Sequence, residues 1–152
     1  MSQRTESKVD STARSWVPPG IFHHVGFVVG SIENDVHSFA ESLVAEWDGQ
    51  IIHDPLQQVR VSFLRSKRSP ADPLFELIEP VGKDSPVTTF LERRGGLHHI
   101  CYLSENLDAE LETCRARGSL VVRAPVPAAA FGGRRIAWVY TKNKLLIEYL
   151  ER

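Results

Sequence analysis

Two histidine doublets, FHHVGF at residues 22–27 and GLHHICY at residues 96–102, each begin an apolar run and decide how this sequence is organised. Each doublet is followed by an amphipathic segment and then by three runs rich in β-branched and aromatic residues, a composition typical of strands. The order of one strand, one helix and three strands therefore occurs twice. We interpret this order as an internal duplication.

The first copy is predicted from a change of hydrophobic period. Its helix carries apolar residues at helical spacing, and Gly49 is placed to end it. Those apolar residues are Val36, Phe39, Ala40, Leu43, Val44 and Trp47. Strands are expected at QIIH (50–53), QVRVSFLR (58–65) and LFELIE (74–79).

The second copy repeats the pattern. A strand at HHICYL (98–103) precedes a helix that Asn106 can cap and Gly118 can end. The remaining strands are expected at SLVVR (119–123), RRIAWVY (134–140) and KLLIEYLE (144–151). Between the copies, DSPVTTFLERR predicts a short helix with Ser85 as its N-cap and Pro86 in its first turn.

These elements predict an α+β protein with one compact domain. We expect a flexible N-terminal tail over residues 1–20, a first βαβββ module over 21–82, a connecting helix over 83–95 and a second βαβββ module over 96–152.

Composition limits the partners and the compartment. The net charge of −1 gives no reason to expect a nucleic acid or an anionic membrane, so a small molecule or a protein is the expected partner. Cys101 and Cys114 are predicted to be buried free thiols of a reducing compartment. The polar start lacks the apolar core of a signal peptide, and no run approaches the roughly 18 apolar residues of a membrane span, so we expect a cytoplasmic protein.

Strand parity selects one set of polar residues. Alternate residues of a strand face opposite sides, so Val25 and Phe27 are expected under a helix and His24 on the other face. The same parity puts Glu76, His99 and Glu148 on that helix-free face, and it turns His23 and His98 toward the opposite side as structural residues. His24 to Glu76 spans 52 residues and His99 to Glu148 spans 49, so the acidic partners recur at nearly equal distances.

Four such side chains in one cavity predict a metal site. Two carboxylates buried together would repel each other, and a divalent cation removes that cost. Imidazole and carboxylate ligands suit Co, Ni, Zn, Mn or Fe, and four ligands in an octahedral site leave two positions for substrate. Each residue taken alone is more often structural or solvent-exposed; their matched positions favour the metal.

Together these residues resemble the vicinal oxygen chelate superfamily, which includes glyoxalase I, extradiol dioxygenases, and fosfomycin and bleomycin resistance proteins. The resemblance covers about residues 21–151 and implies two tandem βαβββ modules that form a cup-shaped mixed sheet around a metal. Within it, the segments HDPLQQVRVSFL, ELIEP, DSPVTTFLERRGGLHHICY and LIEYLE are most similar to the methylmalonyl-CoA epimerase family.

That family implies roles for individual residues. His24, Glu76, His99 and Glu148 would hold a divalent metal that stabilises an enolate, and a carboxylate would carry the α-proton. Several bacterial relatives have a glutamate at the position that valine occupies here, Val61. A valine side chain cannot act as a base. Glu148 is then the remaining candidate for the proton carrier.

The resemblance also implies a substrate-binding loop. AFGGRR, residues 130–135, is similar to the glycine loop beside the family's active site, so Arg134 or Arg135 is expected to meet a phosphate or carboxylate. A hairpin loop with solvated arginines is the competing interpretation.

We therefore expect a metal-dependent isomerase or epimerase that acts on an acyl-thioester or another 2-carbonyl substrate, in a homodimer. A lyase similar to glyoxalase I, a dioxygenase, and a non-catalytic small-molecule-binding or resistance protein remain the alternatives. Val61 is the best support for the last of these.

Overall fold

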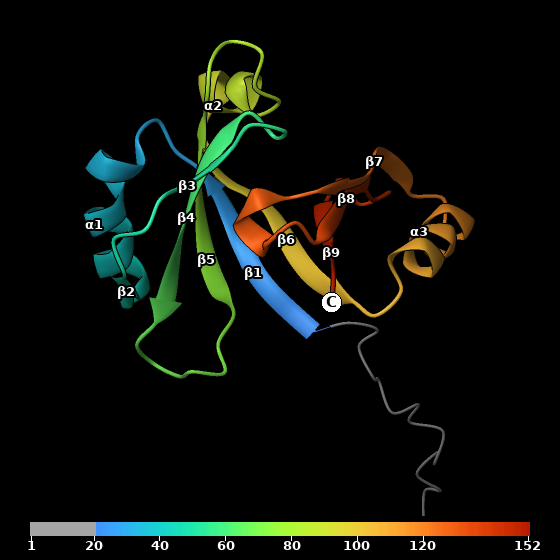
Figure 1. The fold of residues 1–152 in the computed structure, drawn as a ribbon, viewed down its shortest axis with the longest axis horizontal. Coiled ribbons are helices and arrows are strands. Elements are labelled where there is room, and N and C mark those ends of the chain that lie inside the picture. The colour runs from blue at the N-terminus through green and yellow to red at the C-terminus, as the bar shows by residue number, and fades with distance from the viewer. Residues whose placement is uncertain (1–20) are drawn as a thin grey trace, which may run out of the picture.

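The computed structural model describes residues 21–152, and the tail predicted for residues 1–20 lies outside the described residues. The chain forms one nine-stranded mixed sheet with a helix on each flank and a short helix between the two halves (Figure 1). This arrangement confirms the predicted α+β fold.

The first half contains five strands and one long helix. Its elements are β1 (Ile21–Val28), α1 (Ile32–Leu43), β2 (Ala45–Trp47), β3 (Ile52–Asp54), β4 (Val59–Ser66) and β5 (Leu74–Pro80). The second half follows the connecting helix. Its elements are α2 (Thr88–Arg93), β6 (Gly96–Ser104), α3 (Leu107–Ala116), β7 (Leu120–Pro127), the 3₁₀ turn η1 (Ala129–Phe131), β8 (Arg135–Tyr140) and β9 (Leu146–Glu151).

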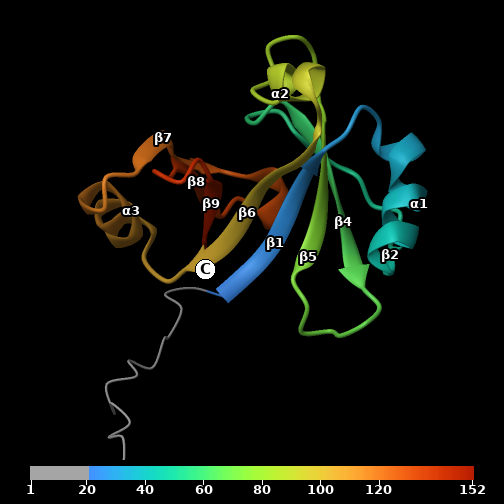
Figure 2. The same ribbon diagram turned by 180° about the vertical axis from the view of Figure 1, so that it is seen from behind.

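The sheet repeats one pairing scheme around its centre. The strand order is β2-β4-β5-β1-β6-β9-β8-β7, and β3 pairs with β4. β1 is parallel to β5, β6 is parallel to β9, and the two first strands pair with each other antiparallel. Seen from behind, β1 and β6 run next to each other between the two outer helices (Figure 2).

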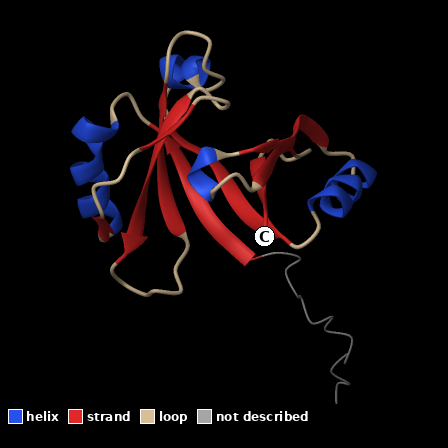
Figure 3. Ribbon diagram, in the orientation of Figure 1, coloured by secondary structure: helices blue, strands red, loops and turns tan. Residues whose placement is uncertain are grey.

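The two long helices each cover one half of the sheet (Figure 3). Beneath α1, the ring of Phe27 meets that of Phe39 at a centroid distance of 5.3 Å, as strand parity predicted. In α3, Leu107 and Leu111 are buried against the sheet, in one cluster with Val139 of β8. Burial of such side chains contributes about 1.5–3 kcal/mol each, which fixes the helices against the sheet.

The first helix ends earlier than the sequence pattern predicts. Ser31 caps it through its Oγ, which accepts from the backbone N–H of Asn34, and the helix ends where Val44 adopts a left-handed conformation with φ of 52°. Trp47 therefore lies in β2, and its Nε1 donates to Ser62 Oγ at 2.7 Å. The helical spacing of apolar residues extends past the end of α1 to Trp47, because Trp47 packs against the same hydrophobic core as the apolar residues of α1.

The connecting helix starts later than predicted. α2 begins at Thr88 with Val87 as its N-cap, and Ser85 contributes its backbone carbonyl rather than its hydroxyl. Pro86 and Val87 form a turn that comes before the helix.

Both histidine doublets lie at irregularities in the β1–β6 pairing. His24 pairs with Cys101 and Phe22 with Tyr102, so His23 is an additional residue of β1. Farther along, Gly26 pairs with His99 and Phe27 with Leu97, so His98 is an additional residue of β6. An additional residue of this kind is a β-bulge, which interrupts the alternation of side chains between the two faces.

Cys101 and Cys114 are buried free thiols, as predicted. None of the helices within residues 21–152 has both the length and the apolar character needed to cross a bilayer.

We predict that Gly26→Ala destabilises the protein by about 1–3 kcal/mol, because an added Cβ would overlap the imidazole of His99, which lies across the strand pair. Urea denaturation of the two proteins measures the change. Gly30→Ala is the control, since a Cβ at Gly30 meets no atom within 4 Å. Equal losses of stability in both variants would contradict this account of the β1–β6 contact.

Candidate metal centre

The four polar residues selected by strand parity lie together, and all four are buried. His24 Nε2 is 3.1 Å from His99 Nε2, 3.3 Å from Glu76 Oε2 and 3.1 Å from Glu148 Oε2. His99 Nε2 is 3.4 Å from Glu76 Oε2 and 3.7 Å from Glu148 Oε2. Both imidazoles thus direct the same ring nitrogen toward two carboxylates.

Strand register explains how the residues converge. Glu76, Gly26 and His99 lie in one row across β5, β1 and β6. His24, Cys101 and Glu148 lie in a second row across β1, β6 and β9. Gly26 and Cys101, each two residues after its doublet, are the small residues between the polar ones. The pairing of the strands therefore places the four polar side chains close together.

The spacing of these atoms fits a divalent cation. A metal that holds nitrogen and oxygen at about 2.1 Å separates neighbouring donors by about 3.0 Å in an octahedral site and by about 3.4 Å in a tetrahedral one. The five distances here range from 3.1 to 3.7 Å. Glu148 Oε2 is also buried without a hydrogen-bond partner, which an ion would supply.

Electrostatics support the same conclusion. Burial disfavours the charged form of His24, but the neighbouring carboxylates of Glu76 and Glu148 outweigh burial and raise the pKa of this imidazole well above its ordinary value. Burial likewise opposes ionisation of Glu148, and the adjacent imidazoles of His24 and His99 nevertheless lower the pKa of this carboxyl. The carboxylates thus attract a cation at the imidazoles, and a proton and a metal ion compete for that position.

The first histidine of each doublet also belongs to this site, which corrects the prediction that both face away. His23 Nδ1 lies 2.7 Å from His24 Nδ1, and His98 Nδ1 lies 3.0 Å from His99 Nδ1. Parity failed here because both residues are bulged. Burial, followed by the charge of the adjacent histidine, lowers the pKa of His23 and of His98 to about 4.

A second group of possible ligands lies behind the first. Nitrogens of His23 and His24 and the sulfur of Cys101 all lie within 4.8 Å of one another. Burial and then the charge of Glu148 raise the pKa of the Cys101 thiol, whereas a metal needs the thiolate. The group formed by His24, Glu76 and His99 is the better candidate, since carboxylate and imidazole donors bind a metal without ionising a thiol.

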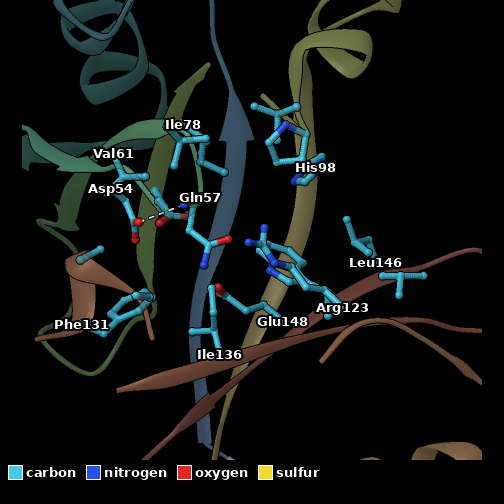
Figure 4. Close-up of a pocket in the computed structure, with 18 residues that line it drawn as sticks. Asp54, Gln57, Val61, Ile78, His98, Arg123, Phe131, Ile136, Leu146 and Glu148 are labelled. Carbon is cyan, nitrogen blue, oxygen red and sulfur yellow. Dashed lines mark hydrogen bonds between the residues drawn. The ribbon is translucent and has the colours of Figure 1, made fainter. Parts of the chain in front are cut away.

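The polar cluster opens on a cavity of about 280 Å³. Glu76, Glu148 and His98 lie on its wall, together with apolar side chains that include Val61 and Ile78 (Figure 4). Valine therefore lines the cavity at the position where relatives of the epimerase type were expected to carry a base.

The sequence pattern did not identify three polar residues of the cavity, Asp54, Gln57 and Arg123. Gln57 and Arg123 line it, and Gln57 Nε2 is buried without a hydrogen-bond partner. Figure 4 shows the Gln57 amide pointing into the pocket. Nothing in the local sequence distinguishes Gln57 from Gln58, and Arg123 lies near the end of a run that the pattern identified only as a strand.

Asp54 positions this side of the cavity. Its Oδ1 accepts from the backbone N–H groups of Leu56 and Gln57 at 3.1 and 3.0 Å. Its Oδ2 accepts from Ala129 N–H, in the second half of the chain, at 2.7 Å. One buried carboxylate thus fixes the loop that carries Gln57 and ties it to η1.

The two arginines expected at the substrate lie elsewhere. Arg135 pairs with Glu151 at 2.6 Å and with Asp108 at 3.4 Å. Arg134 donates through Nε to the carbonyl of Phe131 at 3.2 Å. Neither arginine lines the cavity, and the arginine on its wall is Arg123. Contact of Arg134 or Arg135 with a substrate stays a prediction.

The sequence is similar to those of known proteins. The chain is 29% identical to the ethylmalonyl-CoA/methylmalonyl-CoA epimerase of Cereibacter sphaeroides over 85% of this chain and 96% of that protein. It is 34% identical to the uncharacterized protein YqjC of Bacillus subtilis over 84% of this chain and 89% of that protein.

The fold matches solved epimerase structures. A variant of the Streptomyces coelicolor methylmalonyl-CoA epimerase in complex with 2-nitronate-propionyl-CoA superimposes with a TM-score of 0.73, covering 88% of this chain and 98% of that one at 22% identity. A sequence profile of the glyoxalase/bleomycin resistance protein/dioxygenase superfamily matches residues 23–138. The match covers most of the chain and agrees with the fold, so the chain belongs to the glyoxalase/bleomycin resistance protein/dioxygenase superfamily.

Proposed function

We propose that this protein is a metal-dependent epimerase or isomerase that acts on an acyl-thioester or another 2-carbonyl substrate. The observation that carries the proposal is the buried group of two imidazoles and two carboxylates beside a small cavity. His24, Glu76, His99 and Glu148 would hold the divalent metal. The similarity to methylmalonyl-CoA epimerases supports the reaction class.

A bound divalent metal would supply Lewis acidity toward the carbonyl oxygens of the substrate, which lowers the barrier to loss of an adjacent proton. The protein residues then have to bind the substrate, exclude water and move that proton. Val61 and Ile78 provide an apolar wall that limits the access of water.

We assign the proton transfer to Glu148. Its Oε2 is buried, has no hydrogen-bond partner and belongs to a residue on the cavity wall. Of the other carboxylates on that wall, Asp54 is less available because it accepts three backbone hydrogen bonds, and Glu76 is the alternative carrier that the paired variants below distinguish from Glu148. A glutamate near a Lewis acid can remove a proton from carbon and return it.

The cavity suggests how a large substrate would bind. A volume of about 280 Å³ is below the range of about 300–1,000 Å³ of sites that enclose a whole drug-sized ligand. Only the reacting acyl end of a thioester would enter, and the rest of the substrate would lie outside. The free Nε2 of Gln57 would donate to an acyl oxygen there.

Val61 favours a second candidate, a protein that binds a small molecule without turning it over. That function needs the cavity and not a proton carrier. Lyases similar to glyoxalase I and dioxygenases belong to the same superfamily as this chain, so both are further candidates. The dioxygenase is less favoured because four protein ligands leave fewer metal positions for oxygen than two histidines and one carboxylate. The homodimer and the cytoplasmic location remain predictions.

We expect the purified protein to bind one Co²⁺ or Zn²⁺ per chain, measured by titration calorimetry and elemental analysis. His24→Ala and Glu76→Ala should each lose at least tenfold in affinity, because each removes a donor atom from the cluster. His53→Ala is the control, since His53 is an exposed residue of β3. Binding that is as tight in His24→Ala as in the unaltered protein would exclude this metal site.

Exchange of the substrate's α-proton for deuterium tests the proposed reaction. Metal-loaded protein incubated with methylmalonyl-CoA and other acyl-CoA thioesters in deuterated water should introduce deuterium at the α-carbon, detected by mass spectrometry. Absence of exchange with every acyl thioester, in a protein that binds metal, would support the binding protein instead.

A pair of isosteric variants tests the assignment of Glu148. Glutamine keeps an oxygen that can bind a metal but cannot carry a proton, so Glu148→Gln should lower the exchange rate by about 100-fold or more while metal stays bound. Glu76→Gln is the matched control and should keep most of its exchange. Equal rates in the two variants would mean that the proton moves through another group.

A further inference from the structure

We propose that His23 and His98 are positioning residues that fix the ring orientation and the tautomer of His24 and His99, respectively. Each would accept a hydrogen bond from Nδ1–H of the next histidine, so that the Nε2 lone pair of that histidine faces Glu76 and Glu148. The inference rests on the proposed metal site and adds to it a second pair of residues.

A histidine that binds a metal through Nε2 needs a hydrogen-bond acceptor for the proton on its Nδ1. A neutral imidazole carries its proton on one nitrogen, and it can bind a metal only through the other. Nε2 of His24 and Nε2 of His99 face the two carboxylates, and if both bind the proposed metal, the proton of each ring must lie on Nδ1. Because both side chains are buried, each Nδ1–H needs an acceptor within the protein.

Among residues 21–152, the hydrogen-bond contact to each Nδ1 comes from the preceding histidine, and the Cys101 thiol also lies near His24. The distances are 2.7 Å between Nδ1 of His23 and His24 and 3.0 Å between Nδ1 of His98 and His99. The acceptor must lack a proton on Nδ1, and His23 and His98 therefore carry theirs on Nε2.

The bulges make this contact geometrically available. On a regular strand, neighbouring residues point to opposite faces, and their rings would be separated by the sheet. His23 and His98 are the additional residues of β1 and β6, and each reaches the ring beside it. The two halves of the duplication use the same device at equivalent places, although their other local residues differ.

Aromatic neighbours hold the first histidines in place. The ring of His23 meets Phe131 edge-on at a centroid distance of 5.6 Å. His98 meets Phe90 at 4.8 Å and Trp138 at 6.0 Å. These contacts restrict rotation of the accepting rings, as is typical of residues that orient metal ligands.

The test compares leucine and asparagine at the two positions. Leucine fills the space of the ring and accepts no hydrogen bond, so His98→Leu and His23→Leu should each weaken Co²⁺ binding by about 10–100-fold and change the visible absorption of the bound cobalt. Asparagine offers an acceptor oxygen at about the place of Nδ1, so His98→Asn should recover most of the affinity and the spectrum. His53→Leu is the control for loss of an exposed histidine.

A measurement on the unaltered protein does not depend on the folding of any variant. Nitrogen-15 NMR of the Zn²⁺-loaded protein should show His24 and His99 protonated at Nδ1, and His23 and His98 protonated at Nε2. Another tautomer at His23 or His98 would overturn the proposal.

The outcomes separate the two levels of inference. If the unaltered protein binds no Co²⁺, the proposed metal site itself fails. If it binds Co²⁺ and the leucine variants keep its affinity and spectrum, or if asparagine restores no more than leucine does, the metal site stands and the positioning role is overturned.

Discussion

The antiparallel pairing of β1 with β6 is the contact on which the rest of the structure depends. It joins the two halves at the middle of one continuous sheet and brings their histidine doublets onto neighbouring strands, where His24 and His99 meet. The parallel neighbours β5 and β9 then add one glutamate from each half. Hydrogen-bonded strands are rigid supports, which suits a site whose ligands must be held within fractions of an ångström.

This pairing concentrates charge where burial makes it costly. Glu76 and Glu148 are both nearly inaccessible to water and face the same two imidazoles. A fold that buries two carboxylates needs a compensating cation, either protons on the histidines or a metal. Glu76 and Glu148 also lie on the wall of the cavity. A cation held by these carboxylates would therefore lie beside a substrate bound in the cavity.

Much of the architecture was predictable because it is periodic. Alternation along β5 and β9 assigned Glu76 and Glu148 to the helix-free face, the order of elements predicted the duplication, and the family resemblance implied the mixed sheet. Predictions from periodicity were wrong where the backbone is locally irregular. The left-handed Val44 ended α1 before Trp47, and the bulges turned His23 and His98 toward the residues that follow them. A period carries no information about a conformation that a single residue adopts under tertiary constraints.

By itself, the sequence determined the duplication, the strand faces and the four polar residues expected to converge, because each of these follows from spacing along the chain. Only the tertiary structure decided which residues line the cavity. Gln57 is there because the buried carboxylate of Asp54 ties its loop to Ala129 in the other half, and Arg134 and Arg135 are absent because their partners lie elsewhere. The contact between Asp54 and Ala129 joins residues 75 positions apart, and it forms only when the two halves fold against each other.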